Sequence, residues 1–241
     1  MSFHVAADAY DRFMGQYSGP LAEQFAELAG VQAGQRALDV GCGPGALTGQ
    51  LVERLGAGAV AAIDPSPPFV EAMRARFPEV DVRAGVAERL PFPDGTFDVT
   101  LAQLVVHFMA DPVAGLAEMA RVTRPGGVVA ASVWDHARGG GPLTTFWRAV
   151  RDVDPGAVDE AGLAGVREGH LGELFDAAGL KHIEPSTLTV TVQFATFAQW
   201  WEPYTLGVGP AGAFVAGLGD AGRAALRELS LIHISEPTRP Y

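Results

Sequence analysis

The stretch Ala37-Leu-Asp-Val-Gly-Cys-Gly-Pro-Gly45 decides the fold of this 241-residue chain. A short apolar run ends here in an acid, three glycines follow at alternate positions, and a helical pattern starts near Ala46. A strand that runs into such a turn brings its backbone close to a ligand, because glycine lacks the Cβ that would collide. The following helix offers free N–H groups at its N-terminus. The pattern predicts a nucleotide-type cofactor site at the carboxyl edge of a first β-strand.

Two acids, Asp39 and Asp64, indicate which cofactor the loop binds. By spacing alone, the loop also satisfies the dinucleotide fingerprint, with Gly41, Gly43 and Ala46 as its small residues. Asp39 stands two residues before the first glycine, where an acid would repel a pyrophosphate but attract a cation. S-adenosylmethionine, with its sulfonium and α-ammonium, is such a cationic ligand. Asp64 ends a second apolar run, and an acid at that place can accept both ribose hydroxyls of either cofactor class.

Composition limits the class of protein and of partner. Hydrophobic residues make up 48% of the chain and charged residues 19%, which indicates an ordered globular protein. The formal net charge is −11 and no Lys/Arg cluster occurs, which disfavours a nucleic-acid partner. No apolar run approaches the ~20 residues that span a bilayer, so we expect no membrane partner and a cytoplasmic location. We predict no metal site.

Alternating strand and helix patterns predict an α/β fold, a Rossmann-like doubly wound, mostly parallel sheet. The expected strands are Arg36–Gly41, Ala59–Asp64, Val80–Ala84, Phe97–Val106, Gly127–Trp134 and a weaker sixth at Thr187–Phe194. The expected helices are Pro20–Ala29, Ala46–Leu55, Pro67–Phe77, Pro112–Thr123, Leu143–Arg151 and Leu171–Ala178.

Four sequence blocks in order resemble the signature blocks of class I S-adenosylmethionine-dependent methyltransferases. They are Leu38-Asp-Val-Gly-Cys-Gly-Pro-Gly45, Ile63-Asp-Pro-Ser66, Ala87-Glu-Arg-Leu-Pro-Phe-Pro-Asp-Gly-Thr-Phe-Asp98 and Arg121-Val-Thr-Arg-Pro-Gly-Gly127. Within the class, the chain is similar to the small-molecule branch that includes the ubiquinone and menaquinone biosynthesis methyltransferases. The resemblance implies S-adenosylmethionine as cofactor and a small-molecule methyl acceptor, and it covers residues 8–135 more firmly than 136–228.

The resemblance also implies further cofactor-binding residues. Cys42 lies inside the glycine loop, where the family often has an acid and where a backbone contact is expected. Val86 stands where relatives often carry an Asp or Asn against the adenine, and the backbone of Ala87 would serve the same ring. Gln103 falls where the fourth strand leaves the sheet and faces the sulfonium in relatives. Tyr10 belongs to an N-terminal segment that resembles a lid over the methionine moiety. Together with Asp39, Gly41, Gly43, Gly45 and Asp64, these residues form the predicted cofactor site.

The expected domain layout follows from the same resemblance. A single methyltransferase domain would span residues 1–228, with a lid at 1–20 and roof insertions at 136–182 and 196–228. Residues 229–241 break the isoleucine-poor composition of the preceding chain, and they resemble the translation of a sequencing-library adaptor. We therefore expect a scar at 229–241, and the family's last strand to be missing through C-terminal truncation. Leu229 to Ile234 has a strand-like composition, and we expect residues after Ser235 to pack poorly.

The catalytic group is the least determined part of the prediction. Methyl transfer is an in-line displacement, so positioning alone can supply up to ~7–11 kcal/mol. His107, at a carboxyl strand end, is the candidate catalytic residue, although a packed histidine is the ordinary alternative; His136 and Asp135 are other candidate bases. Two other functions stay open: a nicotinamide-dependent oxidoreductase, and a non-catalytic S-adenosylmethionine-binding protein, since the family has no single obligatory catalytic residue.

Overall fold

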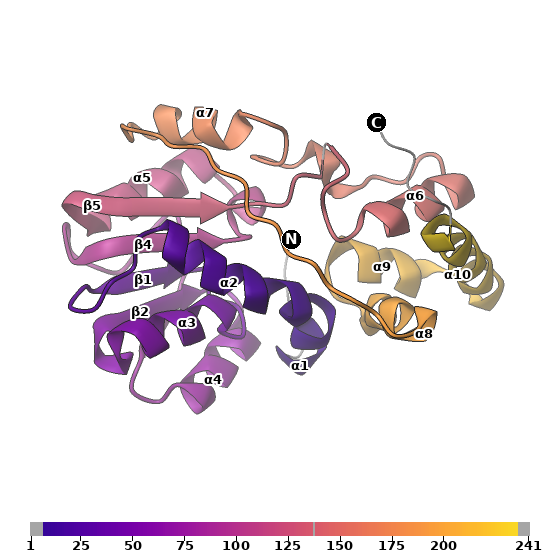
Figure 1. Cartoon of the computed structure of the whole chain (residues 1–241), viewed down its shortest axis with the longest axis horizontal. Helices are drawn as coiled ribbons and strands as arrows, with labels where there is room; N and C mark the ends of the chain where they lie inside the picture. Colours follow the sequence, from indigo (N-terminus) through magenta and orange to yellow (C-terminus); the bar gives the residue numbers. More distant parts are fainter. Residues whose placement is uncertain (1–6, 137, 236–241) are drawn as a thin grey trace.

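The computed structural model describes residues 7–136 and 138–235. Its centre is a five-stranded sheet with the strand order β3-β2-β1-β4-β5, and every neighbouring pair is parallel (Figure 1). The strands are β1 (Ala37–Val40), β2 (Val60–Asp64), β3 (Asp81–Ala84), β4 (Phe97–Gln103) and β5 (Thr123–Ser132). The predicted α/β class and the first five predicted strands are therefore confirmed, with ends that differ by a few residues.

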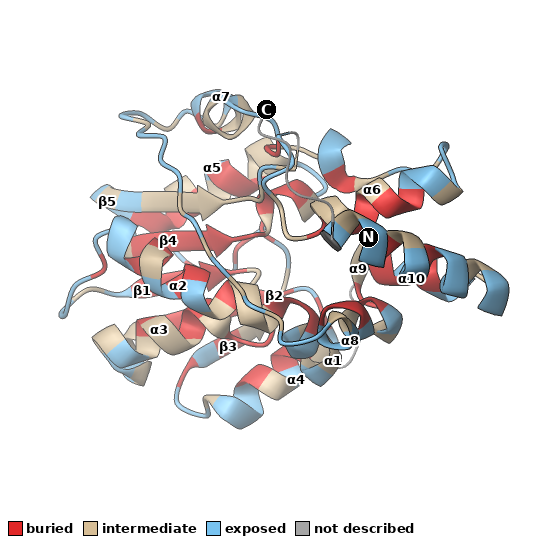
Figure 2. Cartoon of the chain, turned by 45° about the vertical axis from the view of Figure 1, so that its right-hand side comes forward, coloured by how far each residue is buried: buried red, intermediate tan, exposed pale blue. Residues whose placement is uncertain are grey.

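Helices cover both faces of this sheet. Apolar side chains of α2 (Gln16–Leu28), α3 (Ala46–Leu55) and α4 (Pro67–Arg76) pack on one face. Side chains of α5 (Pro112–Val122) and α7 (His170–Ala177) pack on the other. Figure 2 shows the three inner strands β2, β1 and β4 and the sheet-facing sides of the helices as buried, whereas the edge strands β3 and β5 are mostly half-buried or exposed. Helices on both faces of a parallel sheet are the layering of a doubly wound domain.

The central strand β1 sets the position of the site. All four of its residues are buried, and it pairs with β2 on one side and β4 on the other. Val40 lies in register with Ile63, and Asp39 with Leu101. Because parallel strands end at the same edge of the sheet, the loops after β1, β2 and β4 converge there, and ligands bind at this edge where the strand order reverses.

A group of short helices forms a roof beyond the carboxyl ends of the strands (Figure 1). It consists of α1 (Ala7–Tyr10), the π-helical turn η1 (Asp11–Gly15), α6 (Thr144–Val153), η4 (Glu160–Gly162), α8 (Phe197–Trp201), η5 (Glu202–Leu206), α9 (Gly209–Gly217) and α10 (Asp220–Ser235). An aromatic cluster holds much of it together: Phe146 stacks on Tyr204 with ring centroids 4.4 Å apart, and Phe13 meets Tyr204 edge-on. The predicted lid and roof segments thus share one core.

The predicted sixth strand, Thr187–Phe194, does not join the sheet. This segment runs extended across the α2 face (Figure 1), where Gln24 Nε2 donates a hydrogen bond to the Thr189 carbonyl oxygen. Leu188 and Val190 are half-buried and alternate with exposed neighbours. Apolar residues alternate along Thr187–Phe194. Such alternation indicates that one side of a segment is covered, but it carries no information on what the backbone pairs with.

Two other expectations about the C-terminal half are corrected. Leu229 to Ile234 is helical rather than strand-like, because it continues α10, which packs along α6. Helix α7 lies within the predicted roof insertion 136–182 but packs beside α5 on the sheet. The expectation of poor packing after Ser235 lies outside the described residues. Within the part of the chain that the structure describes, no helix is both long and apolar enough to span a membrane.

Candidate functional site

The loop after β1 contains three glycines, and the reason for a glycine differs among the three positions. Gly41, Gly43 and Gly45 all have positive φ angles, of 71°, 52° and 98°. A Cβ on Gly41 would lie 2.5 Å from the side chain of Val105, and one on Gly45 would lie 2.4 Å from the sulfur of Met73. Around Gly43, apart from the residue itself and its two chain neighbours, no described heavy atom lies within 4 Å of the Cβ position. Protein packing thus requires Gly41 and Gly45, whereas Gly43 presents bare backbone to open space.

Asp64, at the end of β2, holds this loop in place. Its Oδ2 accepts a hydrogen bond of 2.9 Å from the backbone N–H of Gly43, and its Oδ1 accepts one of 2.8 Å from the N–H of Ser66. Burial raises the pKa of Asp64, while these two hydrogen bonds oppose the rise. The carboxylate therefore links the end of β2 to the glycine loop.

Asp39 is a buried acid beside the same loop. Only 1% of the residue is exposed, and its Oδ2 accepts a hydrogen bond of 2.6 Å from the hydroxyl of Thr48, in the first turns of α3. Burial raises the pKa of Asp39 to about 7, and the charge of Asp64 adds to the rise. An ionised acid in this position lacks a positive partner among the hydrogen-bond contacts that the structure describes, so it favours a cationic ligand.

A cavity of about 350 Å³ opens at this edge of the sheet, and we call it the loop cavity. The residues that line it are Tyr10, Ser18, Asp39, Gly41, Cys42, Gly43, Pro44, Ala46, Leu47, Gln103 and Leu104. Gln103 Nε2 donates to the Ser18 carbonyl oxygen at 2.9 Å, which leaves the buried Oε1 without a hydrogen-bond partner in the described structure. The structure thus brings six of the predicted cofactor residues together around one space: Tyr10, Asp39, Gly41, Cys42, Gly43 and Gln103.

The remaining predicted cofactor residues do not line the loop cavity. Gly45 packs against α4, and the hydrogen bonds that the structure gives Asp64 are with the backbone N–H groups of Gly43 and Ser66. Val86 is 46% exposed, while Ala87 is buried in the core between the sheet and α5. An adenine contact by Val86 or Ala87 stays a prediction.

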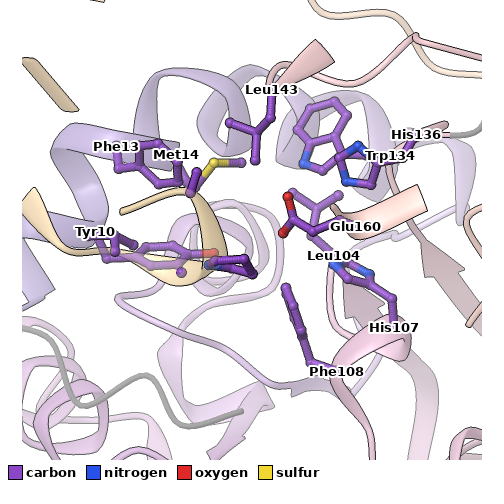
Figure 3. Close-up of a pocket in the computed structure, with 14 residues that line it drawn as sticks. Tyr10, Phe13, Met14, Leu104, His107, Phe108, Trp134, His136, Leu143 and Glu160 are labelled. Atoms are coloured by element: carbon purple, nitrogen blue, oxygen red, sulfur yellow. The ribbon is translucent and has the colours of Figure 1, made fainter. Parts of the chain in front are cut away.

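A second cavity, of about 450 Å³, lies next to the first under the roof; we call it the roof cavity. Its lining residues are Tyr10, Phe13, Met14, Leu104, His107, Phe108, Trp134, His136, Leu143, Glu160, Val208, Gly209, Pro210 and Ala211. Tyr10 and Leu104 line both cavities. Leu104 has a φ of 61°, a left-handed conformation that is rare for a bulky residue and is often associated with functional sites. In Figure 3, Tyr10, Phe13 and Met14 lie on one side and His107, His136 and Glu160 on another.

The candidate catalytic residue His107 reaches the roof cavity but is a poor base. It is 6% exposed, and burial lowers the pKa of its imidazole to about 3, with a smaller contribution from His136. It is therefore neutral near pH 7, and its buried Nδ1 has no hydrogen-bond partner in the described structure. Burial also lowers the pKa of His136. The side chain of Asp135, the other candidate base, accepts a local hydrogen bond from the N–H of Arg138.

Sequence reasoning missed two polar groups of the roof cavity. Glu160, in η4, is 5% exposed, and its Oε2 accepts a hydrogen bond of 3.2 Å from Nε1 of Trp147. Trp134, just after β5, has a buried Nε1 without a hydrogen-bond partner in the described structure. No motif surrounds Glu160 in the sequence, so only the packing of the roof brings it to the cavity. Among residues 7–136 and 138–235, no cluster of His, Cys, Asp or Glu suits a metal ion.

The central part of the chain matches a known family model. Residues 38–131 match the family described as a methyltransferase domain. This region contains β1 through most of β5 and the glycine loop, but none of the roof helices that follow β5.

Individual relatives match a similar region. An uncharacterized methyltransferase of Mycobacterium tuberculosis is 36% identical over 127 residues, which cover 53% of this chain and 49% of that protein. The malonyl-[acyl-carrier protein] O-methyltransferase of Serratia marcescens is 34% identical over 131 residues, covering 52% of this chain and 51% of that protein. The chain thus spans about half the length of these curated relatives.

Solved structures share the fold over a longer stretch. The [4+2]-cyclase SpnF superposes with a TM-score of 0.55 at 22% sequence identity, covering 91% of this chain and 74% of that chain. At this identity the likeness concerns the fold alone. Because that neighbour is named a cyclase, the reaction has to be argued from the site.

Proposed function

We propose that this chain is a class I methyltransferase that binds S-adenosylmethionine in the loop cavity and a small-molecule methyl acceptor in the roof cavity. The observation that carries the proposal is the buried acid Asp39 beside the bare backbone of Gly43. Together they suit a ligand that is cationic and approaches the loop closely. The methyltransferase family model over residues 38–131 supports the same assignment.

The residues of the loop cavity fit this cofactor better than a dinucleotide. Asp39 would attract the α-ammonium and the sulfonium, and it would repel a pyrophosphate. The orphaned Oε1 of Gln103 offers a hydrogen-bond acceptor to an ammonium in the same cavity. Asp64 would accept the ribose hydroxyls while it holds Gly43. When bound, S-adenosylmethionine supplies an electrophilic methyl group.

The roof cavity would position the acceptor. It adjoins the loop cavity through Tyr10 and Leu104, so an acceptor there would lie next to the cofactor. The largely apolar lining would exclude water from the space between the two bound molecules. Holding two reactants in line is the main requirement of a displacement reaction, and it explains how the site works without a strong base at His107.

The kind of acceptor is a further part of the proposal. The Serratia marcescens relative is named an O-methyltransferase, which supports transfer of the methyl group to an oxygen. Within class I, the sequence blocks favour the small-molecule branch that includes the ubiquinone and menaquinone methyltransferases. The net charge of −11 argues against a nucleic acid as the acceptor.

Calorimetric titration with S-adenosylhomocysteine and with NAD⁺ tests the cofactor assignment. We expect saturable binding of S-adenosylhomocysteine and none of NAD⁺. The reverse preference would favour the oxidoreductase and overturn the proposal. Release of S-adenosylhomocysteine from S-adenosylmethionine in the presence of phenols, quinol precursors or amines then separates an enzyme from a non-catalytic binding protein.

A further inference from the structure

The roof cavity has an unusual balance of charge for a site that receives a substrate. Its residues include one carboxylic acid, Glu160, and neither a lysine nor an arginine occurs among those described as lining it. A carboxylate or phosphate on a ligand would therefore meet a like charge without a side-chain cation to offset it. On charge alone, we expect the cavity to disfavour anions.

Glu160 is placed to bind a ligand rather than to serve the fold alone. Its carboxylate is buried and accepts one hydrogen bond, from Trp147 Nε1, through Oε2. Figure 3 shows the carboxylate directed into the cavity. A carboxylate has acceptor capacity for more than one donor, and burial raises the pKa of Glu160 because its charge is poorly solvated. A hydrogen-bond donor on a ligand would restore that solvation.

Two further polar atoms in the same cavity lack partners. The Nδ1 of His107 and the Nε1 of Trp134 are both buried without a hydrogen bond in the described structure. Because buried polar atoms are nearly always paired in folded proteins, orphaned atoms that line a cavity indicate a ligand that pairs with them. Both groups are neutral near pH 7: the indole of Trp134 carries no charge, and burial lowers the pKa of His107 to about 3. Neither group therefore supplies a positive charge that would offset the charge of a bound anion.

The rest of the cavity favours an apolar, flat body. Most of the other residues that line the cavity are apolar, among them Phe13, Met14, Phe108 and Leu143, and the indole of Trp134 adds an aromatic wall. We propose that Glu160 selects a neutral aromatic acceptor by accepting a hydrogen bond from its hydroxyl or N–H group, and that the cavity rejects carboxylates. This inference rests on the proposed function in one respect: it takes the ligand of the roof cavity to be the methyl acceptor.

This selectivity differs from what the relative's name suggests. The Serratia marcescens protein is named for a malonyl group, which carries a carboxylate. Glu160 lies outside residues 38–131, so the family match does not include the group proposed to choose the acceptor.

Three probes that share a naphthalene ring and differ in one substituent test the inference on the whole chain. We would titrate 2-naphthol, 2-methoxynaphthalene and 2-naphthoate and measure equilibrium binding, with and without S-adenosylhomocysteine. The phenol should bind at least about 10-fold more tightly than the ether or the carboxylate, as expected for one charge-assisted hydrogen bond. In Glu160→Gln, which keeps an acceptor for Trp147, the preference for phenol over carboxylate should fall by about 10-fold.

Controls separate this role from a structural one. Trp147→Phe removes the hydrogen bond to Glu160 but keeps the charge, so the phenol preference should stay. Affinity for S-adenosylhomocysteine should be the same in both variants as in the unmutated protein. If the unmutated protein does not bind S-adenosylhomocysteine at all, the proposed function is contradicted rather than this inference. Tighter binding of 2-naphthoate, no binding of 2-naphthol, or an unchanged preference in folded Glu160→Gln would overturn the inference.

Discussion

The hydroxyl of Thr48 donates a hydrogen bond of 2.6 Å to Oδ2 of Asp39. The pair joins the first turns of α3 to β1 behind the glycine loop, and both residues are buried. The hydrogen bond stabilises the ionised form of Asp39, while burial acts in the opposite direction and prevails, so the pKa lies near 7. Thr48 thus helps to keep the acid ready for a cation.

Affinity for S-adenosylmethionine should depend on pH through Asp39. A cationic ligand favours the ionised acid, so affinity should rise with pH through the unliganded pKa of about 7 to a plateau. It should fall again only where the ligand's own α-ammonium loses its proton. Near pH 6, affinity should be about 10-fold below the plateau. Calorimetry across pH measures this. The dependence should disappear in Asp39→Asn and move to higher pH in Thr48→Val; a flat profile in the unmutated protein would contradict the assignment.

The same acid affects the stability of the unliganded protein. Because the folded-state pKa of Asp39 is raised above its ordinary value, the folded protein holds a proton that the unfolded chain releases between the two pKa values. The contribution of Asp39 to the free energy of unfolding should therefore fall as pH rises from about 4 to about 7. Denaturant unfolding of the unmutated protein and Asp39→Asn should show a difference that grows over this range.

Asp64→Ala should weaken S-adenosylhomocysteine binding strongly. The two ribose hydroxyls would lose charge-assisted hydrogen bonds of ~1.5–3 kcal/mol each, so the Kd should rise by at least ~100-fold. The N–H of Gly43 also loses its acceptor, which should loosen the loop. Asp64→Asn keeps one acceptor oxygen and should show a smaller loss. Unchanged affinity in a folded Asp64→Ala protein would rule out the ribose assignment.

Gly43→Val should abolish S-adenosylhomocysteine binding by occupying the space that the ligand needs. A positive φ by itself costs a side chain about 1–2 kcal/mol, which affects folding as well. Gly30→Val is the matched control, because Gly30 also has a positive φ and open space but lies outside both cavities. The two variants should lose similar thermal stability, and only Gly43→Val should lose binding. Full affinity in Gly43→Val would mean that the loop does not hold the ligand.

Gly41→Ala should destabilise the protein by about 2 kcal/mol or more, since it combines a strained φ with overpacking. The new Cβ would lie 2.5 Å from Val105. The double variant Gly41→Ala/Val105→Ala removes the two closest contacts and leaves one of 3.1 Å to the Cβ of residue 105. A double-mutant cycle in urea should therefore give a favourable coupling energy. Additive effects of the two substitutions would show that the contact with Val105 does not cause the destabilisation by Gly41→Ala.

Much of the loop cavity could be predicted from the sequence, because most of the residues that form it are close together along the chain. The apolar runs that end in Asp39 and Asp64, and the glycine loop between them, place a strand, a turn and a helix within a short stretch. Helix α3 has the predicted bounds Ala46–Leu55. Once the strands are parallel, their carboxyl ends share one edge, and the residues that follow them lie together.

The sequence by itself determined the α/β fold, the glycine loop and the two acids beside it, since residue type and spacing along the chain encode these features. Only the tertiary structure decided that Thr187–Phe194 crosses the α2 face, that Leu104 takes a left-handed conformation between two cavities, and that Glu160 faces the same space as His107. These features depend on which distant segments pack against one another. The alternation of apolar residues records that a surface is covered but not by which partner, and a lone acid such as Glu160 carries no periodic pattern at all.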